Sequence, residues 1–342
     1  MGLLEPLPIT VCDCLYLKLN RLFFIMFHWI LRMYLKLFFA GILSFLTVGC
    51  SSVGILKPGQ TLVMDAVDMP AGDLAGPGPE PVVSTRITVN HQGEDLLVAL
   101  FQPAHSKASP PSIVFLPGLM ATDDQYESYA RALASRGFIV AVHGWYSPFT
   151  SDIELAHNAN VIADWLIKTQ GVDAKRMGVA GHSMGGKDAV LAAARYGVFA
   201  SVVAIDPDDN GNVSVVHGLL GGLRVPLLLI GAEVAWRASS VCAPKSANYE
   251  RFFEQAPSGT VQLTLKDADH VQMLDEPDRF GYGICRSGTA DSRQVRITTR
   301  RATVGFFVQH LLGGPALQKP ASSDGLIRVA QGKMDGRRIV VR

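Results

Sequence analysis

The chain has 342 residues, of which 48% are hydrophobic and 18% charged, a composition that favours a folded protein with a large core and excludes an intrinsically disordered chain. Its formal net charge of +1 excludes both a broad basic surface for nucleic acid and an acidic tail, so no polymeric partner is predicted. We expect a small apolar molecule as the ligand and a monomeric protein.

An apolar segment precedes the rest of the chain. Residues 22–48 consist mainly of Phe, Leu, Ile, Met and Trp, interrupted by Arg32 and Lys36. Read from Met33, the segment is a short export signal with a positive start at Lys36 and an apolar stretch after it. A membrane-spanning anchor formed by the whole run is the alternative, because its length is sufficient. Three start codons remain open: Met1, Met26 and Met33.

A cysteine at the end of this segment predicts the kind of anchor. Gly49 is a small residue directly before Cys50, and two serines follow. This pattern resembles the processing site of bacterial lipoproteins, in which the cysteine is acylated and becomes the mature N-terminus. We therefore expect an exported protein, held on the periplasmic or cell-surface side of a membrane by a lipid on Cys50. Residues 1–50 are then the signal, and residues 51–81, rich in Gly, Pro and Asp, a flexible tether.

Export also bears on the remaining cysteines. If the chain starts at Met33 and Cys50 carries a lipid, Cys242 and Cys285 are the other cysteines of the mature protein. An even pair of cysteines in an oxidising compartment predicts a disulfide bond between them. Two free buried cysteines are the alternative.

Residues 82–314 carry the pattern of a catalytic domain. Two runs on either side of residues 90–95 predict a β-hairpin, and a continuous apolar strand follows at 112–116. Further strands are expected at 138–142, 177–180, 200–205, 225–230 and 261–265, and helices at 126–136, 153–169, 187–196, 248–254 and 299–312. This alternation predicts an α/β fold with a largely parallel sheet covered by helices on both faces. Residues 315–342 are expected to be a polar tail, with an edge strand at 339–341 left open.

One stretch in this domain carries a catalytic motif. The strand at 177–180 leads into Gly181-His182-Ser183-Met184-Gly185 and then into an Ala-rich helix. A buried strand that ends at Gly-x-Ser-x-Gly and continues into a helix is the nucleophile elbow of the α/β-hydrolase fold. The glycines are expected because such a turn is too tight for side chains. The motif therefore predicts Ser183 as a nucleophile, with His182 packed beneath the elbow.

A serine nucleophile needs a general base and an acid that orients the base. In this fold the chain order is serine, acid, histidine. His270 follows the last apolar strand and is the predicted base, because His217 comes too early and His310 lies in the terminal helix. Asp206 and Glu233 both follow strands, so topology leaves both open as the acid.

The remaining site residues follow from position in the fold. An oxyanion hole requires two backbone N–H groups, which we assign to Met184, after the nucleophile, and to Leu119, beside Gly118. Asp208 and Asp209 are expected to be solvated, and no metal site is predicted. Aromatic and methionine side chains on strand-end loops are expected to line the substrate pocket, the alternative being ordinary core residues: Met120, Trp145, Tyr146 and Trp236.

Several further segments resemble the chlorophyllase family. They are Gly-His-Ser-Met-Gly-Gly-Lys at the elbow, Ala-Ile-Asp-Pro at 204–207, Cys-Ala-Pro-Lys at 242–245, residues 269–275, and Tyr-Gly-Ile-Cys-Arg-Ser-Gly at 282–288. The resemblance covers about residues 113–312. It implies Ser183, Asp206 and His270 as the catalytic triad and so favours Asp206 over Glu233. It also implies hydrolysis of the phytyl ester of chlorophyll-like pigments with no cofactor.

The chain departs from this family after the nucleophile. Chlorophyllases usually carry Arg there, whereas this chain has Met184, a residue common in cutinase-like and polyester-cleaving hydrolases. The Pro117-Gly118-Leu119 loop also differs from the His-Gly-Phe pattern of the plant enzymes. Two other functions therefore stay open. One is a surface-anchored lipase, cutinase-like or polyester hydrolase of other apolar esters, and the other is a catalytically inactive, lipid-anchored binding protein.

Overall fold

The computed structural model describes residues 61–64, 74–144, 149–234, 241–279, 281–314, 327–334 and 337–340. The predicted export signal and Cys50 lie outside these residues, as do Trp145, Tyr146 and Trp236 of the predicted pocket. Those assignments therefore stay predictions. Within the described ranges, no helix combines the length and the apolar character needed to cross a membrane.

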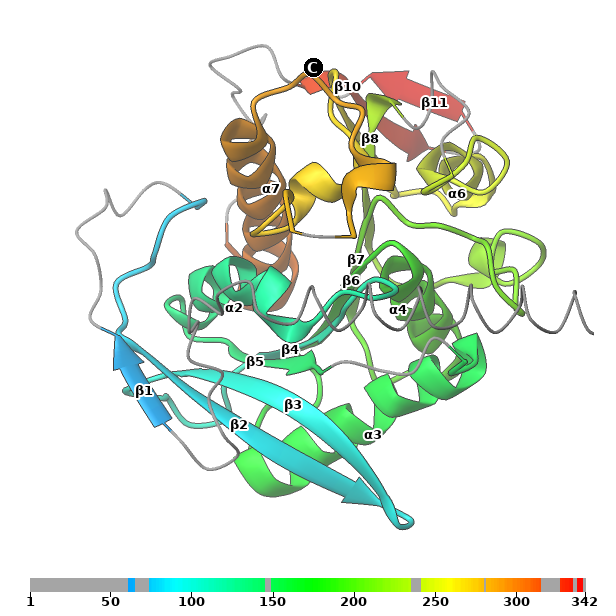
Figure 1. Cartoon of the computed structure of the whole chain (residues 1–342). Helices are drawn as coiled ribbons and strands as arrows, with labels where there is room; N and C mark the ends of the chain where they lie inside the picture. The colour runs from blue at the N-terminus through cyan, green and yellow to red at the C-terminus, as the bar shows by residue number, and fades with distance from the viewer. Residues whose placement is uncertain are drawn as a thin grey trace, which may run out of the picture. The chain divides into compact units, whose positions relative to one another are not determined.

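The described strands form one sheet of eleven, in the order β1-β2-β3-β5-β4-β6-β7-β8-β9-β10-β11. Its centre is parallel and consists of β5 (Ile139–His143), β4 (Ser112–Leu116), β6 (Met177–His182), β7 (Ser201–Ile205), β8 (Leu227–Ala232) and β9 (Val261–Leu265). The predicted hairpin, β2 (Val82–His91) and β3 (Glu94–Pro103), continues the sheet antiparallel to β5 (Figure 1). Every residue of β4 to β8 is buried, which explains their continuous apolar sequences.

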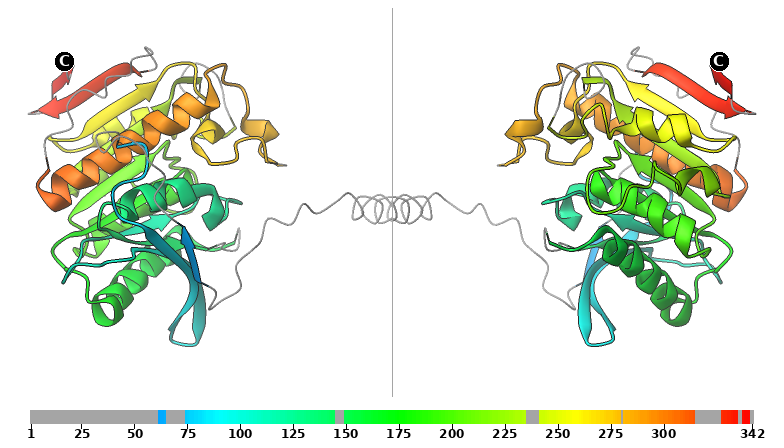
Figure 2. Two further views of the ribbon diagram at one scale, coloured as in Figure 1. Left: turned by 90° about the vertical axis from the view of Figure 1, so that its left-hand side faces the viewer. Right: turned by 90° about the vertical axis from the view of Figure 1, so that its right-hand side faces the viewer.

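Helices cover both faces of the sheet (Figures 1 and 2). α2 (Glu127–Ala134) and α7 (Ser292–Leu312) share one core with alternate strand residues such as Phe115 and Val203. α3 (Asp152–Gln170), α4 (Met184–Arg195) and α6 (Tyr249–Gln255) share the other core with the intervening residues, such as Val114 and Val202. This two-core arrangement confirms the predicted α/β-hydrolase fold.

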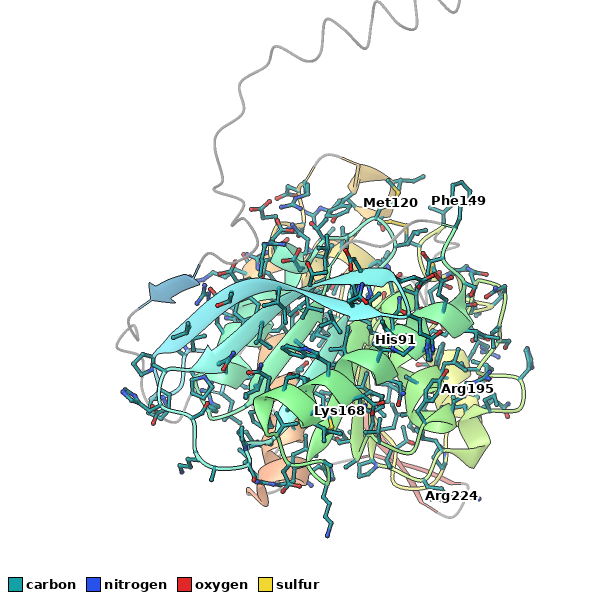
Figure 3. The ribbon with its side chains drawn as sticks, turned by 90° about the horizontal axis from the view of Figure 1, so that it is seen from below. His91, Met120, Phe149, Lys168, Arg195 and Arg224 are labelled. Atoms are coloured by element: carbon teal, nitrogen blue, oxygen red, sulfur yellow. A yellow bond between two sulfur atoms is a disulfide. The ribbon has the colours of Figure 1, made fainter. Side chains whose placement is uncertain are left out.

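α3 and α4 have exposed charged residues near their C-terminal ends. Lys168 near the end of α3 and Arg195 at the end of α4 are exposed and point away from the sheet (Figure 3). α3 begins with a capping box, in which the Ser151 side chain accepts from the Glu154 N–H and the Glu154 carboxylate accepts from the Ser151 N–H. Both ends of this long helix are thus fixed, because Gly171 ends it in the left-handed conformation.

The sheet extends past both expected domain limits. β1 (Thr61–Met64) pairs with β2 inside the stretch predicted as a tether. β10 (Ile327–Met334) pairs antiparallel with β9, and β11 (Arg337–Val340) pairs with β10, inside the predicted polar tail (Figure 2). Backbone hydrogen bonds join these edge strands, and such bonds leave little trace in the hydrophobic pattern on which the limits of 82 and 314 were based.

The last helix also begins earlier than predicted. α7 starts at Ser292 and not at Thr299, because the Asp291 side chain accepts from the Gln294 N–H at 2.8 Å and caps an extra stretch. This stretch contains Arg293 and Arg296 and so lacks a clear apolar period. The start of this helix was therefore indicated by the capping residue Asp291 and not by the spacing of apolar residues.

Candidate active site

Ser183 lies on the turn between β6 and α4, as the motif predicts. Its backbone has φ 58° and ψ −127°, a conformation that non-glycine residues rarely adopt. A side chain at Gly181 would overlap the Gly185 carbonyl group, and one at Gly185 would overlap the Pro117 carbonyl group. Both glycines are therefore required for the close packing of the elbow against the neighbouring loop.

His270 and Asp206 come together from different strands. Asp206 follows β7, and His270 starts the short 3₁₀ helix η3 (His270–Met273) after β9. Nδ1 of His270 lies 2.7 Å from Oδ2 of Asp206, and the other oxygen of Asp206 accepts from the Ala232 N–H at 2.9 Å. Asp206 is fully buried, so its carboxylate faces the imidazole of His270 away from solvent.

Glu233, the other acid that topology left open, is placed differently. Its Oε2 accepts from the backbone N–H of Asp267 at 2.9 Å, in the turn after β9. Of the two candidates, Asp206 is the one that contacts His270. Topology alone could not separate them, because both residues follow parallel strands at the same edge of the sheet, whereas the family resemblance favours Asp206.

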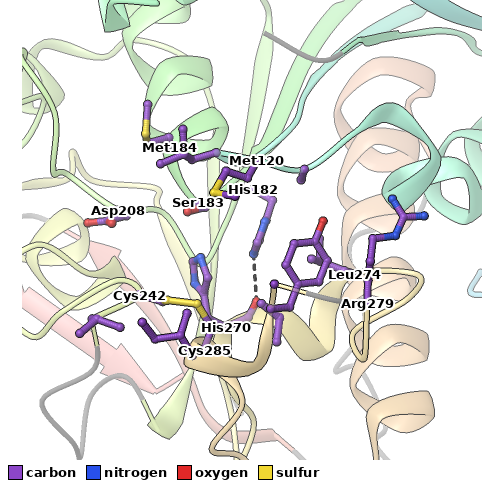
Figure 4. Close-up of a pocket in the computed structure, with 18 residues that line it drawn as sticks. Met120, His182, Ser183, Met184, Asp208, Cys242, His270, Leu274, Arg279 and Cys285 are labelled. Atoms are coloured by element: carbon purple, nitrogen blue, oxygen red, sulfur yellow. Dashed lines mark hydrogen bonds between the residues drawn. A yellow bond between two sulfur atoms is a disulfide. The ribbon is translucent and has the colours of Figure 1, made fainter. Parts of the chain in front are cut away.

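Ser183 and His270 line one cleft of about 260 Å³ (Figure 4). Leu119, Met120 and Met184 also line it. Leu119 is 42% exposed and Met120 69% exposed, so the rim of the cleft is apolar and open to solvent. The wall further contains the apolar residues Val241, Val271, Leu274 and Ile284. Such a cleft suits an apolar ligand.

The two predicted oxyanion donors lie at the same cleft. Met184 is the first residue of α4, so its N–H has no acceptor within the helix. The N–H of Gly118 donates to the Tyr126 hydroxyl at 2.9 Å, which leaves the next N–H, that of Leu119, as the candidate in this loop. Gly118 itself packs closely, because a Cβ there would lie 3.1 Å from the Cβ of Ser183.

Backbone strain gathers at this site. Seven non-glycine residues in the described part of the chain have positive φ, and three of them are Met120 (62°), Ser183 (58°) and Asp206 (40°). Each such residue costs on the order of 1–3 kcal/mol and persists only where the surrounding structure holds it. The strain thus marks the loop that carries Leu119, the elbow and the predicted acid.

His182 is buried directly below the cleft, 3% exposed. Its Nδ1 lies 3.1 Å from the Tyr126 hydroxyl and its Nε2 lies 3.0 Å from the His270 carbonyl oxygen. Burial and the neighbouring His270 hold the pKa of His182 well below its usual range. His182 therefore stays uncharged, and both of its ring nitrogens are occupied by these contacts.

Asp208 corrects the expectation of a solvated charge. It is 9% exposed and lines the cleft, and its Oδ1 accepts from the backbone and side-chain N–H groups of Asn210 at 3.2 Å and 2.9 Å. Burial raises its pKa. The burial of Asp208 was not predictable, because Asp208 belongs to a polar run of residues. Nowhere in the described residues do three or more His, Cys, Asp or Glu side chains form a group able to hold a metal ion.

The structure joins Cys242 and Cys285 in the predicted disulfide, with 5.7 Å between their Cα atoms. Both cysteines line the cleft (Figure 4). The loop that contains Cys285 is also bonded to Asp269, the residue before η3. Oδ2 of Asp269 accepts from the N–H groups of Ser287 and Gly288 at 3.0 Å and 2.8 Å. The disulfide therefore joins two walls of the cleft, and one of these walls is bonded to the residue before His270.

Comparison with known proteins agrees with this geometry. The sequence model of the family described as Chlorophyllase matches residues 81–318. Chlorophyllase-1, chloroplastic, from Citrus unshiu is 27% identical over 224 residues, which cover 58% of this chain and 67% of the plant protein. Chlorophyllase-2 from Arabidopsis thaliana is 24% identical over 238 residues, covering 59% and 74%. Cutinase est1 from Thermobifida alba is 25% identical over 167 residues, covering 46% and 53%.

Proposed function

The chain belongs to the chlorophyllase family, and on that premise we propose that it is a serine carboxylic-ester hydrolase. The observation that carries the proposal is the meeting of Ser183 and His270 in one apolar cleft, with Nδ1 of His270 2.7 Å from Asp206. The chlorophyllase and cutinase relatives support an ester hydrolase in general. We further propose the serine chemistry and the identity of the ester.

The proposed reaction proceeds in two halves. His270 accepts the Ser183 proton at Nε2, because Nδ1 is bonded to Asp206, and Oγ attacks the ester carbonyl carbon. The N–H groups of Met184 and Leu119 stabilise the oxyanion, and the alcohol leaves with the proton returned by His270. Water then attacks the acyl-enzyme, gives its proton to His270 and releases the acid, with the proton returned to Ser183. Asp206 fixes the imidazole tautomer in both halves.

We propose an ester of a chlorophyll-like pigment as the first candidate substrate. Its support is the family match over residues 81–318 and the apolar rim formed by Leu119 and Met120. The second candidate is a cutin-like or synthetic polyester. It is favoured by the cutinase relative and by Met184 at the position after the nucleophile.

One experiment separates these proposals. The full chain and Ser183→Ala are incubated with chlorophyll a and, in parallel, with short-chain p-nitrophenyl esters. Chlorophyllide release by the unmodified chain alone would support the pigment ester, whereas p-nitrophenol without chlorophyllide would favour other esters. We expect Ser183→Ala to lower kcat by about 10⁴-fold or more. Full activity in this variant would contradict the serine mechanism.

A catalytically inactive binding protein is tested more simply. A fluorophosphonate probe forms a covalent bond with an activated serine, so labelling at Ser183 should occur in the unmodified chain and not in Ser183→Ala. Absence of labelling at an intact, folded chain would favour the binding protein.

A further inference from the structure

Two buried polar side chains beneath the cleft have no part in the reaction steps above. Tyr126 is 1% exposed and His182 is 3% exposed. The sequence pattern predicts that Tyr126 is a core residue of a helix and that His182 packs under the elbow. Burying a hydroxyl and an imidazole is costly unless both are hydrogen-bonded. Their partners therefore indicate what these groups do.

The contacts form a continuous chain from one wall of the cleft to another. The Gly118 N–H donates to the Tyr126 hydroxyl at 2.9 Å, and this hydroxyl lies 3.1 Å from Nδ1 of His182. Nε2 of His182 then lies 3.0 Å from the carbonyl oxygen of His270 (Figure 4). This series of hydrogen bonds passes beneath Ser183. His182, the residue before Ser183, is at its centre.

The chemistry of the groups assigns one direction to these bonds. The His270 carbonyl oxygen can only accept, so Nε2 of His182 carries the proton. Because burial keeps His182 uncharged, its Nδ1 has a free lone pair and accepts from the Tyr126 O–H. The hydroxyl oxygen is then available to accept from the Gly118 N–H. Each of the three donors in this series of hydrogen bonds therefore has one acceptor.

The two ends of this series of hydrogen bonds lie at the two parts of the site that must be aligned. Gly118 precedes Leu119, the proposed oxyanion donor, and His270 carries the proposed base. The Asp206 carboxylate holds the imidazole of His270, whereas His182 holds its backbone. The rings of His182 and His270 lie 4.6 Å apart, so an uncharged His182 also avoids repulsion when His270 gains a proton.

We propose that Tyr126 and His182 are positioning residues that align the oxyanion loop with His270 across Ser183. This inference rests on the proposed serine-hydrolase function. It predicts that loss of the Tyr126 hydroxyl lowers the rate of the chemical steps without weakening substrate binding, because small displacements of reacting groups cost rate.

Tyr126→Phe tests this with a matched control. The chain offers Tyr129→Phe, because Tyr129 is also fully buried, also packs against Phe115, and donates its hydroxyl to the Met273 carbonyl at 2.6 Å. We expect Tyr126→Phe to lower kcat on a p-nitrophenyl ester by about ten- to a hundredfold with KM nearly unchanged. Tyr129→Phe should lower thermal stability to a similar extent and retain kcat.

A second pair of variants tests the other end. In His182→Gln the side-chain amide can reach the place of Nε2 and donate to the His270 carbonyl, whereas in His182→Asn it reaches only the place of Nδ1. We therefore expect His182→Gln to keep a higher kcat than His182→Asn. This pair remains informative if the Tyr126 variant is poorly folded.

Two results would overturn the inference: equal kcat in Tyr126→Phe and Tyr129→Phe, or a kcat in His182→Gln no higher than in His182→Asn. Failure of the proposed function has a different signature. In that case the unmodified chain would neither cleave esters nor be labelled by a fluorophosphonate at Ser183.

Discussion

Ser183 combines a chemical role with a strained backbone, and the two can be separated. Its φ of 58° suits glycine better than any residue with a side chain. We expect Ser183→Gly and Ser183→Ala both to be inactive, but the glycine variant to be more stable by about 1 kcal/mol, because it relieves the strain that alanine keeps. Thermal unfolding of the two variants in one buffer measures this. Identical melting temperatures would mean that the turn is not strained.

Single substitutions also test which carboxylate, Asp206 or Glu233, acts as the acid that orients His270. Asp206→Asn should lower kcat by about 10⁴-fold, because the amide favours the wrong tautomer of His270. Glu233→Gln is the matched control, since it replaces an equally buried carboxylate that bonds to the Asp267 N–H instead. It should retain most of the activity. A larger loss of kcat in Glu233→Gln than in Asp206→Asn would transfer the role to Glu233.

Asp275 makes stability depend on pH. Burial raises its pKa from 3.8 to about 6, while bonds from Ser128 oppose the shift. The folded chain thus binds this proton more tightly than the unfolded chain does. The stabilisation is complete below about pH 4 and is lost as the pH rises through 6.

Asp275→Asn tests this directly, because its side chain stays uncharged at every pH. As the pH increases from about 4 to about 7, the unmodified chain loses the stabilisation that comes from about one bound proton, and the variant does not. The melting temperature of the variant should therefore rise relative to that of the unmodified chain over this range. Melting curves at intervals over this range measure the difference. A difference that does not change with pH would contradict the raised pKa.

At the scale of elements, the disulfide joins two loops that line the cleft. Val241 and Ile284 flank its cysteines and are 66% and 74% exposed, so these two side chains contribute little packing to the walls. The residues of the proposed triad, in contrast, follow buried strands. In a variant with Cys242→Ser and Cys285→Ser we expect KM to rise more than kcat falls.

The same variant should lose up to about 4 kcal/mol of stability, as chain entropy predicts for cysteines 43 residues apart. Treatment of the unmodified chain with a reductant should reproduce the rise in KM, and the reductant should have no effect on the double variant. An unchanged KM in both cases would mean that the loops keep their positions without the bond.

The elements also indicate what the sequence could predict. The strands and the elbow were predictable, because a buried strand and a tight glycine turn each have a local pattern. The pairing of His270 with Asp206 and not Glu233 depends on how strands lie side by side. The hydrophobic pattern does not record that, and only the resemblance of segments such as residues 204–207 to the chlorophyllase family favours Asp206. Tyr126 and His182 were missed as a pair for the same reason, since 56 residues separate them. A histidine within the elbow motif was the one available signal.

At the scale of the whole molecule, residues before Val82, the predicted start of the catalytic domain, also pack against the fold. Ala75, Gly76 and Gly78 are buried. The Gly78 N–H donates to the Ser135 hydroxyl at 2.6 Å, at the end of α2, and the Arg136 side chain donates to the Gly76 carbonyl at 2.8 Å. On α7, Arg300 donates to the Ala75 carbonyl. Residues 74–81 therefore connect the two helices that cover one face of the sheet.

A chain that starts at Val82 loses these bonds, whereas one that starts at Leu74 keeps them. The shorter chain also loses the bonds from the Glu80 N–H to the Ser135 carbonyl at 3.0 Å and from the Ala104 N–H to the Pro81 carbonyl at 2.8 Å. Five bonds at about 1 kcal/mol each should lower the melting temperature by about 10–20 °C for a domain of this size. Both chains should have the same kcat well below their melting temperatures, because residues 74–81 do not line the cleft. Equal melting temperatures would place the start of the stable domain at Val82. A lower kcat in the shorter chain at low temperature would instead mean that packing on α2 and α7 reaches the site.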